Sequence, residues 1–509
     1  MSSSPEPTRR RRARPVPARP AATGPVDARS AGTWCAPFTG FRVLAAVAVI
    51  GAHSCLSART YPVAGIVQIV AVIVPMFFVV SAYALYRPFI VDDLRGVSPR
   101  SARSFWWRRF LRIYPLYAVA LTAYLVLLPP LRPPSGSVVD YAKLYGFLQV
   151  YDPDLSRFSG IPAAWFLCDE VAFYLLMPFI ALAARWVVLR NRRRRHPGRP
   201  PSAEEILRGH LAVAVGLWVV GFVARPILVL NEVNAATALP ISNLDFYALG
   251  IFVSVATLWE RAGLKLPEPV AYVRERPWLA LGGMVLGATV IALAATDPAV
   301  WTPEQDVLRY LMYTVMAGGA MTYFVLGDQR SAANTWFGDR RWGWLAILSL
   351  HLYLWHQLVL GGFDRYVTEV AELHIGPRFT TGLAVWVGAV AITVAISAAL
   401  RPVLDWPYAR WAHDAQDTHR RRGRRPSGGP SARPGRPGSS RAGGSGGSGR
   451  SSAGRAGPPA AGGRPDGAGR PPNGRRPGAS GRPATGHRPE GGSRRPEGIS
   501  RPDASRPPT

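Results

Sequence analysis

Ten apolar segments alternate with polar segments between residues 38 and 404 of the chain. Each is close to the ~20 apolar residues that a helix needs to cross a bilayer. Pro and Gly interrupt several of them, which membrane bundles tolerate because neighbouring helices satisfy the freed backbone groups. The pattern predicts an all-α fold, a polytopic membrane helix bundle of about ten transmembrane helices. The predicted spans are 38–57, 65–90, 110–130, 162–189, 210–230, 241–260, 278–296, 307–326, 342–362 and 379–404.

Basic residues are distributed unevenly between these segments. The second, fourth, sixth and eighth connections, with their flanks, carry twenty Lys and Arg, and the alternate connections carry six. Cytoplasmic loops hold the excess of Lys and Arg in multi-pass proteins. We therefore expect a multi-pass protein of the cell (plasma) membrane with both termini in the cytoplasm.

The two ends of the chain differ in composition from the apolar region. Residues 1–30 hold seven arginines against two acidic residues, and residues 420–509 hold twenty against four. These ends account for +21 of the formal charge of +29. Rich in Gly, Pro, Ser and Arg, the C-terminal segment is expected to be disordered. We divide the chain into a basic tail (1–33), a transmembrane domain (34–415) and a cytoplasmic tail (416–509).

Composition also excludes several functions. The tail arginines are not interleaved with aromatic residues, so no nucleic-acid partner is expected, and attraction to anionic membrane lipids is the simpler interpretation. The three cysteines (Cys35, Cys55 and Cys168) form neither a metal-ligand spacing nor a disulfide framework. No metal site and no bound cofactor are expected. The first ~30 residues lack the apolar core of a cleavable signal peptide.

Arg42 and His53 are the most informative pair in the first segment. They are eleven residues apart, about three turns, so both lie on one helix face, ~16 Å apart along the axis. Ionisable groups at such depth usually belong to a site. The alternative is that Arg42 anchors the helix at the interface and His53 is a hydrogen-bonded core residue.

Three ionisable residues are expected at one depth. From the span boundaries, His53, Glu170 and His356 lie ~22, ~18 and ~21 Å from the cytoplasmic surface. A carboxylate and two histidines at one level would form a buried acid/base cluster, in which Glu170 orients an imidazole.

A second group is expected near the cytoplasmic surface. Arg42 lies ~6 Å and Ser81 ~8 Å from it, and Arg109 and Arg112 are one turn apart at the start of the third span. Guanidinium groups bind phosphate bidentately, so this cluster suits a phosphate-bearing cytoplasmic ligand. Plain topological anchoring is the alternative.

Two further polar positions are expected to be structural. Asp245 lies near the outer end of the sixth span, where it can cap the helix or pair with Asn243. His351 is five residues before His356 and therefore faces another side of the helix.

Five short motifs, in order, resemble those of the integral-membrane acyltransferase-3 family over about residues 36–410. The first is the leader Phe38–Ala46, with Arg42 and His53 in the Arg-x10-His element. The others are Pro75–Tyr83, which contains Ser81; Arg109–Tyr117, similar to Arg-x-x-Arg-Ile-Tyr-Pro; Trp165–Leu175, with Glu170 and Phe173-Tyr174; and Ser349–His356, similar to Ser-x-x-Leu-Tyr-Leu-Trp-His. Asp405-Trp406-Pro407 stands where a Glu-x-Pro usually closes the last span.

Three positions depart from the family pattern. Ala82 replaces a glycine, so the tightness of a turn there is in question. Phe166 and Cys168 replace two serines, which we expect to alter the choice of acceptor.

The resemblance implies an O-acyltransferase that moves an acyl group from cytoplasmic acyl-CoA to a hydroxyl of a cell-envelope glycan, glycolipid or secreted glycoside. We expect the acyl group to be acetyl. Arg42, Arg109 and Arg112 would meet the polyphosphate of the donor, with Ser81, Tyr174 and His356 as further substrate-binding residues. His53 would act as general base or carry the acyl group, and Glu170 would orient it. The rival class is a transporter or flippase for an envelope saccharide that uses buried His and Glu as a proton relay. A third is a non-catalytic scaffold, which would leave these residues without a role.

Overall fold

The described residues form a bundle of α-helices, and none of them is in a β-strand. The computed structural model describes residues 35–57, 64–155, 159–195, 198–233, 235–294, 302–365 and 379–412. All of these belong to one compact unit, residues 1–428. The predicted tail 416–509 and its boundary lie outside the described residues.

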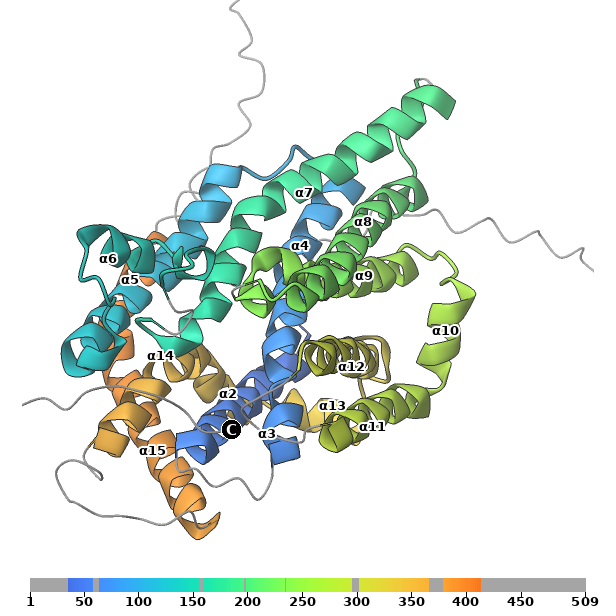
Figure 1. Ribbon diagram of the computed structural model, residues 1–509. Coiled ribbons are helices and arrows are strands. Elements are labelled where there is room, and N and C mark those ends of the chain that lie inside the picture. Colours follow the sequence, from blue (N-terminus) through green and yellow to red (C-terminus); the bar gives the residue numbers. More distant parts are fainter. Residues whose placement is uncertain are drawn as a thin grey trace, which may run out of the picture. The chain divides into compact units, whose positions relative to one another are not determined.

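A long helix occupies each of the ten predicted segments, which confirms the all-α fold (Figure 1). The helices are α2 (Pro37–Ser57), α3 (Ala64–Val70) with α4 (Ile73–Leu94), α5 (Ala102–Leu127), α7 (Trp165–Arg195), α8 (Ala203–Leu230), α9 (Leu244–Arg261), α11 (Pro277–Ala294), α12 (Pro303–Met321), α14 (Gly343–Arg365) and α15 (Phe379–Leu404). The shorter helices α6 (Val138–Tyr145), α10 (Glu268–Glu275) and α13 (Ala332–Phe337) lie in the connections.

Helix α5 begins eight residues before the predicted third span. Ser101 caps it, because its hydroxyl accepts a hydrogen bond from the backbone N–H of Ser104. Arg109 and Arg112 therefore lie two turns and more inside the helix rather than at its start. Apolarity predicted a later start because the first turns of α5 carry arginines.

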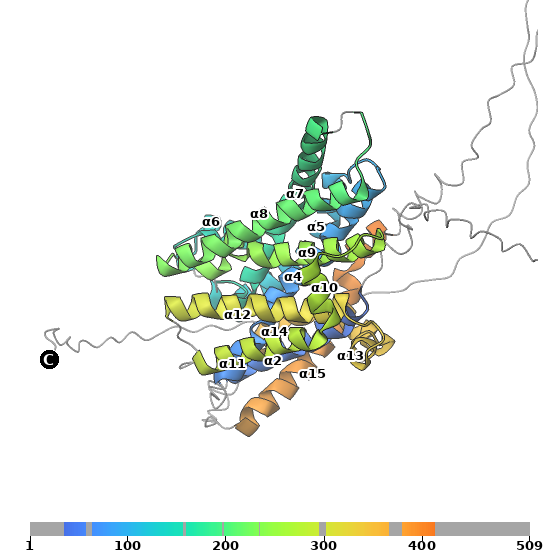
Figure 2. The same cartoon turned by 90° about the vertical axis from the view of Figure 1, so that its right-hand side faces the viewer.

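In the described residues, nine segments are long and apolar enough to cross a membrane. The predicted eighth span, α12, is not among them, because its first turns carry Glu304, Asp306 and Arg309. It nevertheless lies alongside α11 in both ribbon views (Figures 1 and 2).

The contacts between α11 and α12 run in opposite order. Gly287 of α11 lies against Met312 and Met316, whereas Ala280, earlier on α11, lies against Gly319. The two helices are therefore antiparallel neighbours, packed closely through small residues, as is common between membrane helices.

Helices α4 and α9 also approach closely, at the position where a family glycine is replaced. Ala82 is fully buried inside α4, and the helix continues through it to Leu94. A side chain at Gly250 of α9 would collide with Ala82 and with the Val79 carbonyl. No turn occurs at this point, so the concern about its tightness was wrong. Gly250 makes room for the methyl group instead.

Neither role expected for Asp245 is observed, since no side chain caps the start of α9 and Asp245 does not pair with Asn243. Arg225 of α8 donates to both carboxylate oxygens of Asp245, at 2.6 and 3.0 Å, and Asn243 donates to Asp169 at 2.6 Å. Buried carboxylates require donors, and the sequence pattern did not show which neighbouring helix supplies them.

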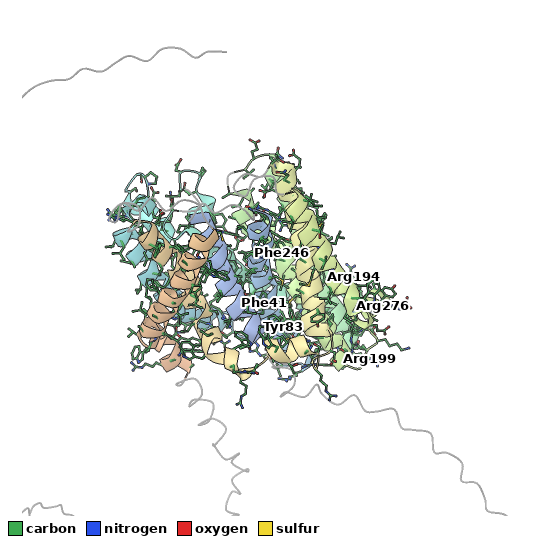
Figure 3. All side chains as sticks on the ribbon, turned by 90° about the horizontal axis from the view of Figure 1, so that it is seen from below. Phe41, Tyr83, Arg194, Arg199, Phe246 and Arg276 are labelled. Carbon is green, nitrogen blue, oxygen red and sulfur yellow. The ribbon has the colours of Figure 1, made fainter. Side chains whose placement is uncertain are left out.

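Aromatic side chains fill much of the interior, and three arginines of the connections lie at its margin. Phe41, Tyr83 and Phe246 lie between helices in Figure 3, whereas Arg194, Arg199 and Arg276 lie together at one edge of the bundle. Arg194 and Arg199 flank the connection from α7 to α8, and Arg276 directly precedes α11. Both connections were predicted to lie on the same side of the membrane.

Candidate active site

One cavity of about 340 Å³ lies between α2, α4, α5, α7 and α14. Five helices that are distant in sequence therefore contribute to it. Seven of the eight predicted site residues line it, namely Arg42, Ser81, Arg109, Arg112, Glu170, Tyr174 and His356. The eighth, His53, contacts the cavity through His356.

The arginines gather in one part of the cavity. Arg42 donates a hydrogen bond of 2.6 Å to the Ser349 hydroxyl of α14. The Arg109 guanidinium lies 5.8 Å from the ring centre of Phe105 and 5.9 Å from that of Tyr174, and its Nε is buried without a hydrogen-bond partner. The cavity thus contains positive charge with donor capacity that a bound anion can satisfy.

Glu170 lies among these basic groups, with Ser81 and Tyr174 beside it and Arg42 and Arg109 in electrostatic range. Its carboxylate is buried, and neither oxygen meets hydrogen-bond geometry with a described residue. The expected pairing of Glu170 with His53 is therefore wrong. Helix rise supplied only an expected depth for each residue, and the direction in which each side chain leaves its helix does not follow from depth.

The two histidines expected at one depth are in contact. His53 Nδ1 lies 2.8 Å from His356 Nε2, with the ring planes 6° apart. Their expected agreement in depth is confirmed by this contact. It joins α2 to α14 across 303 residues of sequence.

The hydrogen bonds of His356 assign the tautomers of the pair. His356 Nδ1 lies 2.7 Å from the Tyr353 carbonyl oxygen and 3.2 Å from that of Leu352, so this nitrogen must carry the proton. In neutral His356, Nε2 is then an acceptor, and His53 must donate from Nδ1. This leaves His53 Nε2 with its lone pair and with no hydrogen bond to a described residue. Of the four ring nitrogens, it is the one available as a base.

Tyr124 of α5 fixes the turn of α14 that carries His356. Its hydroxyl donates to the Leu354 carbonyl at 2.9 Å and accepts from the Leu358 backbone N–H at 2.7 Å. These are two backbone groups that an α-helix normally joins to each other. A side chain inserted into that ladder locally reshapes a helix, so Tyr124 sets the orientation of His356.

His351 of α14 has a structural role. His351 Nε2 lies 3.1 Å from Asp405 Oδ1 at the end of α15, and Arg401 holds the other carboxylate oxygen at 3.2 Å. His351 does not line the cavity. It ties α14 to the segment that aligned with the family's Glu-x-Pro.

One of the two replaced serines bears on the cavity. Phe166 lines it and packs on Phe78 at 4.8 Å between ring centres. Cys168 is buried away from it and donates to the Ala164 carbonyl. The substitution at residue 166 therefore makes the cavity wall more apolar, and the one at 168 does not line it.

Two residues of the site had no role in the sequence interpretation. Ser349 was quoted only as the first residue of a motif, although it is seven residues before His356 and thus on the same face of α14. Tyr124 carried no signal, because nothing in the pattern of α5 marks a tyrosine that inserts into another helix.

The fold and the site define a multi-pass membrane protein in which one internal cavity holds an arginine cluster and His356, the partner of His53. The acyltransferase domain of family 3 matches residues 38–401, more than half of the chain, and the chain belongs to that family. It is a membrane-embedded O-acyltransferase, as the motifs indicated. No curated protein and no solved structure gave a significant match.

Proposed function

We propose that the protein transfers an acyl group, acetyl by preference, from acyl-CoA to a hydroxyl of a cell-envelope glycan, glycolipid or secreted glycoside. The observation that carries this proposal is the single cavity that joins three arginines to a histidine pair. We further propose that it acts in the plasma membrane with both termini in the cytoplasm, so that the donor enters from the cytoplasm.

The arginines fit a polyphosphate. Arg42, Arg109 and Arg112 come from two helices and line one cavity, where guanidinium groups can bind phosphate oxygens bidentately. Arg42 and His53 are ~16 Å apart along α2. A donor whose phosphates and reacting thioester lie well apart therefore suits the site better than a compact anion.

The histidine pair supplies the base. The acceptor hydroxyl loses its proton to His53 Nε2 while its oxygen attacks the thioester carbonyl. The new C–O bond forms, the C–S bond breaks, and the proton passes from His53 to the departing CoA sulfur. His356 Nε2 accepts the Nδ1–H of His53 throughout and so stabilises the imidazolium, as the third member of a catalytic triad does.

A transient acyl-His53 remains the alternative mechanism, since Nε2 is also the available nucleophile. A proton-relay transporter is disfavoured because no described hydrogen bond links Glu170 to the histidines. Membrane lipids and the envelope acceptor are the proposed partners, with no bound cofactor or metal.

Mass spectrometry of envelope glycans tests the function. A deletion strain is expected to lack one acyl mass increment that its parent carries, and the wild-type gene should restore it. A His53→Ala gene expressed at equal level should not. Identical glycan masses in the deletion strain and its parent would contradict the proposed acceptor class.

The donor is tested separately with purified protein. Arg112→Ala and Arg112→Lys should both weaken acyl-CoA binding, because lysine lacks the bidentate fork. Arg330→Lys, in the exposed connection after α12, is the matched control. Unchanged donor affinity in both Arg112 variants would show that Arg112 does not bind the donor and serves only as a topological anchor.

A further inference from the structure

A second cavity, of about 810 Å³, lies along α5 and α7. Its remaining walls are the turn at residues 145–147 and Trp411. Arg109, Ile113 and Tyr174 line both this groove and the active-site cavity. The groove therefore lies directly beside the catalytic centre.

Aromatic residues make up half of the groove lining, and the rim of the groove faces outward from the bundle. Trp107 is 50% exposed, Phe110 44% and Leu175 52%. All three belong to helices long and apolar enough to span the membrane, so this exposed face meets lipid. An apolar groove on a lipid-facing surface is accessible to a lipid chain.

The length of the groove matches one leaflet. From Arg103 to Tyr114 it follows eleven residues of α5, ~16 Å of helix rise, against ~15 Å for half of a bilayer core. Phe147 closes the far end, with its ring 4.1 Å from that of Tyr117 and 6.4 Å from that of Tyr114. Its backbone is left-handed, with φ of 60°, an unusual conformation for a bulky residue.

The near end of the groove is basic. Arg103 and Arg109 line it together with the hydroxyls of Ser101 and Ser104, and no acidic residue is among its described lining residues. Arg103 is exposed and makes no ion pair within the described part of the chain. The groove thus combines a cationic, hydroxyl-bearing mouth with an apolar stretch, and the two together have the length of one leaflet.

We propose that this groove binds one phospholipid with an anionic headgroup. The headgroup lies at Arg103, Ser104 and Arg109, and one acyl chain runs along the aromatic wall towards Phe147. Charge complementarity selects an anionic over a zwitterionic lipid, because the mouth offers guanidinium groups and no carboxylate. The bound chain contacts Ile113 and Tyr174, which also line the active-site cavity.

Native mass spectrometry of the full-length protein tests the proposal. Protein extracted from vesicles of equal phosphatidylglycerol and phosphatidylcholine should retain one phosphatidylglycerol. Arg103→Gln, which leaves the active-site lining intact, should reduce that retention about tenfold, the scale of a lost charged hydrogen bond. Ser104→Trp keeps every charge but fills the mouth, and it should abolish retention of either lipid.

Arg190→Gln is the matched control. Arg190 also lies beside an exposed tryptophan, 5.0 Å from the Trp186 ring, but outside the groove. It should retain phosphatidylglycerol as the wild type does. Equal retention of the two lipids, wild-type retention by Arg103→Gln, or an equal loss in Arg190→Gln would overturn the proposal. None of these outcomes depends on acyl transfer.

Discussion

Arg42 donates a hydrogen bond of 2.6 Å to Ser349. This contact joins the same faces of α2 and α14 that the His53–His356 contact joins. Arg42 precedes His53 by eleven residues on α2, and Ser349 precedes His356 by seven on α14. One pair of helices therefore carries both Arg42 of the arginine cluster and the histidine pair. Their packing fixes the separation of the two ends, as pre-organised sites require.

Ser349→Ala should weaken donor binding. The Arg42 side chain loses a charged hydrogen bond, which typically contributes about 1.5–3 kcal/mol, so the KM for donor should rise about tenfold while kcat changes little. Steady-state kinetics on purified protein measures both. Ser397→Ala, a fully buried serine on α15 outside the cavity, should leave KM unchanged. A fall in kcat alone would contradict this role.

His53→Ala and His356→Ala should behave as changes to one unit. Loss of a general base typically costs 10²–10⁴ in rate, so His53→Ala should lose at least 10². His356→Ala should lose less, because it removes only the partner that orients His53. The double variant should be no slower than His53→Ala, since residues acting together are not additive.

His351→Ala provides the control for that pair. His351 is on the same helix but bonds Asp405, so its loss should lower thermal stability while leaving kcat near wild type. If the rate loss of the His53/His356 double variant equals the product of the single losses, the two histidines act independently and the prediction is contradicted.

Glu170→Gln should act independently of the histidines. Its carboxylate lies among Arg42, Arg109 and Tyr174 and makes no hydrogen bond to the His53–His356 pair in the described residues. Rate losses from Glu170→Gln and His356→Ala should therefore multiply in the double variant, measured as kcat/KM. A double variant no slower than His356→Ala alone would restore the pairing expected from depth.

The shared level of His53 and His356 was predictable, because apolar runs and helix rise determine how far each residue lies along its span. His53 and His356 were expected at one level and are in contact. The direction of each side chain was not predictable, so Glu170 was assigned to a histidine when it lies beside arginines. The same limit applies to Asp245, whose partner Arg225 comes from a helix that the sequence pattern could not place next to it.

Tyr124→Phe should lower kcat about tenfold without changing the KM for donor. The phenylalanine cannot bridge Leu354 and Leu358, so the turn that carries His356 relaxes and the histidine contact lengthens; loss of such a bond costs about 1 kcal/mol. The rate of the Tyr124→Phe/His356→Ala double variant should equal that of His356→Ala, which a purely structural role would not produce.

Tyr117→Phe is the matched control for Tyr124. Tyr117 is also buried on α5 and donates to a backbone carbonyl, that of Leu144, at 2.6 Å. It should lose stability with kcat unchanged. Equal kcat losses in the two variants would show that Tyr124 has no particular effect on His356.

The order of the contacts between α2 and α14 bears on the number of spans. Arg42 and Ser349 come first on their helices, and His53 and His356 come later, so the two helices run in the same direction. With α12 as a crossing, α14 is the ninth span and parallel to the first. Without it, α14 would be the eighth and antiparallel. The structure therefore favours ten crossings, although nine helices in the described residues are apolar enough by composition.

Cysteine accessibility tests whether α12 crosses. Glu304→Cys and Arg330→Cys, exposed positions at its two ends, should react with a membrane-impermeant maleimide from opposite sides in a background without Cys35, Cys55 and Cys168. Polar residues in its first turns do not prevent a crossing, because Arg309 donates to Asp306 and, at 2.9 Å, to the side-chain amide oxygen (Oε1) of Gln68 on α3. Arg276→Cys, before α11, should label from the same side as Arg330→Cys. If the cysteines at 304 and 330 label from one side, α12 does not cross, and the parallel arrangement of α2 and α14 needs another explanation.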